Sequence, residues 1–164
     1  MQLIALADYW MGRDKTHARE LTESIRRSAV ITVECVNLLL QVCAITPGID
    51  QITGTHVASG WRPLGINSST ANAAAKSTHL TGEGCDVQDH VDRRLARWCI
   101  ANLHELEAVG LWIECPRYTG GRNNRDPWLH VQTRAPRSGR RVFLPGTAPP
   151  GDPAFYRRYQ LVEP

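Results

Sequence analysis

The chain has 164 residues, of which 42% are hydrophobic and 21% are charged, and its formal net charge is +3. This length and composition fit one globular domain over residues 1–164 and argue against an independent second domain. No uninterrupted apolar run approaches the roughly 18 residues that cross a bilayer, so we expect no membrane-spanning segment.

The amino-terminal stretch, residues 1–20, has little periodicity. We expect Tyr9, Trp10 and Met11 to anchor it on the domain, and the sequence assigns no chemistry to the run from Asp8 to Asp14. The first clear helix follows, from about Glu23 to Ala44, with Thr22 as its N-cap. Its apolar residues recur at three- and four-residue steps: Ile25, Ala29, Val33, Val36, Leu40 and Cys43.

A short β-rich stretch from Thr55 to Ser59 leads into Gly60-Trp61-Arg62-Pro63. Pro63 keeps the residue before it extended, so Arg62 would be held at the end of a strand. The later elements are predicted as a flexible loop at 67–76, a helix starting at Gln88 or Asp89, a short helix at about 104–109, a strand at 111–114, a long turn at 118–125, a strand at 128–132 and an irregular tail at 146–164. The strands at 111–114 and 128–132 are expected to form a hairpin.

Two histidines and an aspartate are the candidate metal ligands. Six residues separate His79 from Asp86, and Gly82 and Gly84 between them let the backbone fold back. His130 lies downstream in an alternating stretch, so it reads as a strand residue that could point toward the same place. Two imidazole nitrogens and one carboxylate oxygen suit a zinc ion that keeps its fourth position open for water.

The five cysteines are an odd number and form no Cys-x-x-Cys pair, which favours free thiols in a reducing compartment. Cys85 stands beside Asp86 and could be considered as a ligand. Adjacent residues of an extended segment point in opposite directions, so we predict a buried structural role for Cys85 instead.

The motif Ser77-x-His79-x-x-Gly82-x-x-x-Asp86 resembles the zinc D-Ala-D-Ala carboxypeptidase family, and more narrowly its short phage and prophage members. Further motifs support the resemblance and extend it over roughly residues 8 to 145: Asp8 to Asp14, Val36 to Leu39, Ser59 to Pro63, Gly110 to Glu114, Trp128 to Gln132 and Pro136 to Pro145. The resemblance implies an α+β fold of the D-Ala-D-Ala peptidase and Hedgehog type, in which helices pack against a small antiparallel sheet.

The resemblance also implies the site. Zn²⁺ would be held by His79, Asp86 and His130. Arg62 would contact a carbonyl or carboxylate of the substrate, for which its planar five-donor guanidinium is suited. Ser77 and Trp128 would be further substrate-binding residues.

The general base departs from the family pattern, because the family usually places an acid three residues before the last histidine, and Pro127 occupies that position here. Two candidates are left. Glu114 is preferred because it matches an acid that recurs in the phage branch, and Asp126 is the alternative. Asp126 could instead be a turn residue before Pro127, and Glu114 a strand-end residue paired with an arginine.

The function implied is a zinc-dependent peptidoglycan peptidase that hydrolyses stem-peptide bonds involving D-amino acids, as a D,D-carboxypeptidase or an endopeptidase encoded by a phage or prophage. The alternative is a non-catalytic, zinc-holding virion or wall-binding module of the same fold. Without a signal peptide, the protein is expected to be made in the cytoplasm and to reach the cell wall after lysis or within a virion, where tail components would be partners.

We do not expect nucleic acid to be a partner. The carboxy-terminal third carries a cluster of basic residues, Arg134, Arg137, Arg140, Arg141, Arg157 and Arg158. Such a cluster could meet a phosphate polymer or an anionic wall, but it lacks the interleaved aromatic residues that stack on bases. We therefore expect a solvated face.

Overall fold

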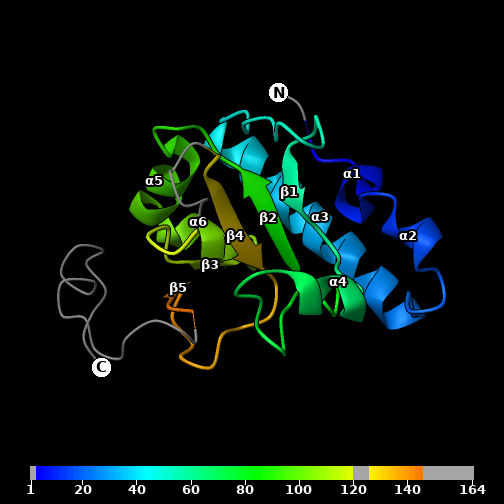
Figure 1. The fold of residues 1–164 in the computed structure, drawn as a ribbon. Coiled ribbons are helices and arrows are strands. Elements are labelled where there is room, and N and C mark those ends of the chain that lie inside the picture. Colours follow the sequence, from blue (N-terminus) through cyan, green and yellow to red (C-terminus); the bar gives the residue numbers. More distant parts are fainter. Residues whose placement is uncertain (1–2, 120–125, 146–164) are drawn as a thin grey trace.

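The structure is a computed structural model that describes residues 3–119 and 126–145. It is an α+β arrangement in which a five-stranded sheet, in the order β1-β2-β4-β3-β5, packs with helices (Figure 1). The elements in chain order are α1 (Leu6–Trp10), α2 (Arg13–Thr16), α3 (Glu23–Cys43), β1 (Val57–Ser59), α4 (Leu64–Ser69), β2 (Gly84–Gln88), α5 (Arg94–Ala101), α6 (Leu103–Ala108), β3 (Trp112–Glu114), β4 (Trp128–Gln132) and β5 (Val142–Phe143).

The predicted sheet was antiparallel, but the observed sheet is mixed. The pairs β1·β2, β2·β4 and β3·β4 are antiparallel, but β5 runs parallel to β3. The antiparallel pairing of β3 with β4 confirms the predicted hairpin, with Ile113 opposite Val131. The parallel strand arises because residues 133–141 carry the chain from the end of β4 across to the outer side of β3.

The long helix α3 lies behind the sheet (Figure 1) and has nearly the predicted bounds. The Thr22 hydroxyl accepts a hydrogen bond from the backbone N–H of Ile25, as expected of an N-cap. Ala44 ends the helix in the left-handed conformation. The buried residues of α3 face the core: Ala29, Thr32, Val33, Val36, Leu39, Leu40 and Cys43.

The two faces of the sheet differ in chemistry because side chains alternate along each strand. The core face is apolar and at most 1% exposed, with Cys85, Val87, Ile113, Leu129 and Val131. The opposite face carries polar and aromatic side chains from β2, β4 and β3: Asp86, His130, Gln132, Trp112 and Glu114. The sheet therefore separates the core from a polar face that can hold a site.

Several sequence predictions need correction. Residues 67–69 belong to helix α4, and the Asn67 side chain is buried, so only the later part of the predicted loop lacks regular structure. The helix predicted to start at Gln88 or Asp89 begins at Arg94, because Gln88 is the last residue of β2. The predicted tail at 146–164, and most of the turn at 118–125, lie outside the described residues.

Two other expectations can be compared directly with the structure. All five cysteines are free thiols, and Cys85 is buried on the core face, opposite to Asp86, as predicted. Within 3–119 and 126–145, none of the helices has the length and apolar character needed to cross a membrane.

Candidate metal centre

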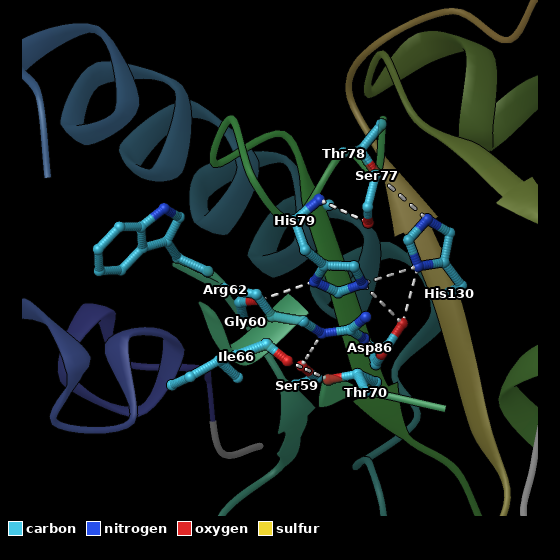
Figure 2. Close-up of polar contacts among 12 residues, drawn as sticks. Ser59, Gly60, Arg62, Ile66, Thr70, Ser77, Thr78, His79, Asp86 and His130 are labelled. Atoms are coloured by element: carbon cyan, nitrogen blue, oxygen red, sulfur yellow. Dashed lines mark hydrogen bonds and ion pairs between the residues drawn. The ribbon is translucent and has the colours of Figure 1, made fainter. Parts of the chain in front are cut away.

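Three side chains converge on the polar face of the sheet (Figure 2). His79 Nε2 lies 3.3 Å from Asp86 Oδ1 and 3.3 Å from His130 Nδ1, and the last two atoms are 2.7 Å apart. Two ligands at about 2.1 Å from one tetrahedral zinc ion are about 3.4 Å apart, close to the two longer separations. These three residues are therefore a group that could hold a metal ion.

Strand pairing places two of the three side chains together. Asp86 in β2 lies directly opposite His130 in β4, and both point away from the core. Gly84 lies two residues before Asp86 on the same face, where a Cβ would overlap the Thr78 hydroxyl and crowd the His130 ring. The φ of Gly84 is not in the left-handed region, so glycine is not required there by backbone conformation. It is required because Thr78 and His130 approach the backbone too closely for a side chain.

His79 comes from the loop between α4 and β2. The loop turns back at Gly82, whose φ of +79° favours glycine, and a Cβ there would also overlap the carbonyl oxygen of Ile25. The Ser77 hydroxyl accepts a hydrogen bond from the backbone N–H of His79 at 3.3 Å. The turn that the sequence predicted between His79 and Asp86 is confirmed at Gly82, whereas Gly84, which was also expected to help the chain fold back, is the first residue of β2.

Hydrogen bonds set which imidazole nitrogens are available for a cation. His79 Nδ1 lies 2.7 Å from the carbonyl oxygen of Gly60, which can only accept, so Nδ1 carries the proton and Nε2 of the neutral ring has a free lone pair. On His130, Nε2 lies 3.3 Å from Gln132 Oε1. The Gln132 amide N–H₂ donates to the carbonyl of Arg134, so its oxygen faces His130. Such outer contacts orient ligating histidines in metal sites.

Arg62 contacts the group from the side opposite His130. Its Nη2 donates to Asp86 Oδ2 at 2.8 Å, and its Nε donates to the Ser59 hydroxyl at 2.8 Å. Asp86 therefore turns one carboxylate oxygen to the guanidinium and the other to the imidazoles (Figure 2). This contact, which fixes the carboxylate, was missed from the sequence, because neither residue is near the other in the chain.

The charges of the group are strongly coupled. Burial would raise the pKa of Asp86, but the two imidazoles outweigh burial and hold that pKa well below its usual range. Burial lowers the pKa of His79, which favours the neutral ring. Burial would also lower the pKa of His130, but the Asp86 carboxylate outweighs it and the pKa is raised. A cation would thus compete with a proton held between His130 and Asp86.

Glu114 is the acid beside this group. It follows Ile113, which pairs with Val131, so its side chain is on the same face as His130, one strand away. Glu114 is half-buried, and burial raises its pKa from 4.5 to about 7, with His130 lowering it and Asp86 raising it. No arginine forms an ion pair with it within the described parts of the chain.

Asp126 and Trp128 precede His130 in the chain, and only Trp128 belongs to β4. Asp126 is exposed and lies before the start of β4, four residues from His130. Trp128 is half-buried, opposite Gln88, and on the same face of β4 as His130. Of the two candidate bases, Glu114 is therefore the one beside the metal group.

The Glu114 carboxyl should make the stability of the metal-free protein fall as pH rises. Its pKa is higher in the folded chain than its ordinary value of 4.5, so folding favours the protonated form, and that advantage disappears as pH rises from 4.5 through 7. Relative to Glu114→Gln, wild type should lose about 1–3 kcal/mol of unfolding free energy between pH 5 and pH 8. Urea unfolding with a chelator measures this, and parallel curves for the two proteins would contradict it.

Comparison of the chain with protein-family models, with curated proteins and with solved structures finds no match. The resemblance to the D-Ala-D-Ala carboxypeptidases therefore rests on the sequence motifs. The structure adds a buried His-Asp-His group and a mixed five-stranded sheet, both consistent with that family.

Proposed function

We propose that the protein is a zinc-dependent peptidase that hydrolyses stem-peptide bonds of peptidoglycan involving D-amino acids. The observation that carries the proposal is the convergence of His79 Nε2, Asp86 Oδ1 and His130 Nδ1 within 3.3 Å of one another, beside Glu114. The substrate class comes from the motif resemblance alone.

Zinc fits the donor set better than magnesium or calcium do, since two imidazoles and one carboxylate suit zinc, whereas hard cations prefer oxygen ligands. Three protein ligands are also the number found in catalytic zinc sites. When bound, zinc would supply Lewis-acid chemistry, polarising a peptide carbonyl and lowering the pKa of water.

The protein's own groups would do the rest. Glu114, with a pKa of about 7, is suited to take a proton from water near neutral pH and to pass it to the leaving amine. Arg62 has Nε and Nη2 engaged by Ser59 and Asp86, which leaves Nη1 for a substrate carbonyl or carboxylate. Trp128 would contribute to substrate binding from the same face of β4. Ser77 would support the loop that carries His79, in addition to any substrate contact.

The cellular setting follows from the same motifs. We propose a phage or prophage enzyme that meets peptidoglycan after release from the cell or as part of a virion. Both D,D-carboxypeptidase and endopeptidase activity fit the proposed chemistry.

Zinc removal provides the test. Purified protein incubated with muropeptides carrying pentapeptide stems should release D-alanine or separate cross-linked stems, and mass spectrometry distinguishes the two products. Chelation should abolish the activity, and added zinc should restore it. Activity that persists without any metal would contradict the proposal.

A non-catalytic role is the other outcome. The absence of an acid at position 127 is the observation that favours it, since Pro127 stands where the family usually has its base. If the protein binds zinc and co-sediments with cell walls, but releases no product from any stem peptide, it would be a wall-binding or virion structural module.

A further inference from the structure

The segment Ser59–Arg62 contacts two of the three candidate ligands. The Gly60 carbonyl accepts from His79 Nδ1 at 2.7 Å, and the backbone N–H of Arg62 donates to the carbonyl oxygen of His79 at 3.1 Å. The Arg62 guanidinium meets Asp86. This segment therefore fixes His79 and Asp86 from outside the metal group.

The amino-terminal stretch packs against the other side of the same segment. A Cβ on Gly60 would overlap the carbonyl oxygen of Tyr9, so the two backbones touch. The rings of Trp10 and Trp61 meet edge-on, with centroids 6.0 Å apart. Arg13 Nη1 donates to the carbonyl oxygen of Trp61 at 2.7 Å.

One peptide unit links the amino-terminal stretch to the metal group. The bond between Trp61 and Arg62 has its carbonyl held by Arg13 and its N–H held by the His79 carbonyl. The orientation of this peptide plane, and with it the approach of Arg62 to Asp86, is thus set jointly by the amino-terminal stretch and by a ligand residue. Tyr9 adds a second contact, since its buried hydroxyl donates to the carbonyl of Gly84, two residues before Asp86.

We propose that Arg13 and Tyr9 are positioning residues for the metal group, acting through the segment Ser59–Arg62 and through Gly84. The sequence assigned no chemical role to the run from Asp8 to Asp14. This run would then stabilise the geometry of the site without contacting the metal ion. The inference rests on metal binding in the proposed function, but not on peptidase activity. Loss of a group bonded directly to a ligating residue typically weakens metal binding 10–100-fold, and Arg13 and Tyr9 act one contact further out, so we expect a smaller loss.

Zinc affinity of Arg13→Gln tests the proposal. Competition with a chromophoric chelator should show affinity several-fold below that of wild type. The visible absorption of the Co²⁺-loaded variant should also shift, because the ligand geometry relaxes. Arg19→Gln is the matched control, since Arg19 is an exposed arginine of the same stretch, and it should bind zinc like wild type. An Arg13→Gln protein with wild-type affinity and spectrum would overturn the proposal.

Tyr9→Phe covers the case in which Arg13→Gln does not fold, which circular dichroism of the metal-free protein would reveal. It removes only the hydroxyl that meets Gly84, and it should lower zinc affinity several-fold; unchanged affinity would count against the proposal. Wild type that binds zinc but cleaves nothing would end the peptidase proposal and leave this one standing. Wild type that binds no zinc would end both.

Discussion

Glu114→Gln should reduce cleavage of stem peptides about 10²–10⁴-fold while zinc affinity stays close to that of wild type. Glutamine keeps the size of the side chain but cannot accept a proton from water. Glu114 is not one of the three converging ligand residues, and it lies on the neighbouring strand, beside His130. Initial rates on muropeptides, together with zinc titrations of the same preparations, measure both quantities.

Asp126→Asn is the matched control, because it removes the competing candidate with an equally conservative change. Asp126 is exposed and precedes β4, four residues before His130, so its variant should retain nearly full activity. The opposite result, in which Asp126→Asn is inactive and Glu114→Gln active, would transfer the role of base to Asp126. If both variants kept the full activity of wild type, neither carboxylate could be the general base.

Local signals explain what the sequence predicted well. The N-cap at Thr22 and the three- and four-residue spacing of apolar residues define α3 without reference to the rest of the chain. The alternation in β4 placed His130 and Gln132 on one face and Leu129 and Val131 on the other, as the structure has them. Such patterns depend on neighbours within a few residues.

Long-range contacts explain what the sequence did not predict. Strand β2 was not among the predicted elements, although Cys85 and Val87 alternate with Asp86 and Gln88; it has only five residues, and its partners β1 and β4 lie far from it in the chain. Strand β5 has only two residues, and its parallel partner is β3. The contacts of Arg13 with Trp61 and of Arg62 with Asp86 span 48 and 24 residues, and no local pattern signals them.

Asp86→Asn should abolish tight zinc binding and also destabilise the metal-free protein by about 3–5 kcal/mol. The carboxylate is buried, 5% exposed, and it compensates the charge of Arg62 as well as accepting from His130. An amide in its place leaves the guanidinium next to a neutral group in a setting with little water. Breaking a buried ion pair by removing one partner carries this cost because the other charge is left without compensation.

The pH dependence and a surface pair make the Asp86 prediction specific. Because the folded-state pKa of Asp86 lies well below its ordinary value of 3.8, the carboxylate stabilises the protein above that pH, and the stabilisation is lost as pH falls further. The difference between wild type and Asp86→Asn in urea unfolding should therefore shrink in acid. Glu83→Gln, which breaks the partly exposed pair with Arg134, should cost at most about 1 kcal/mol. If both variants were equally stable at neutral pH, Asp86 would not be the buried charge on which this site is built.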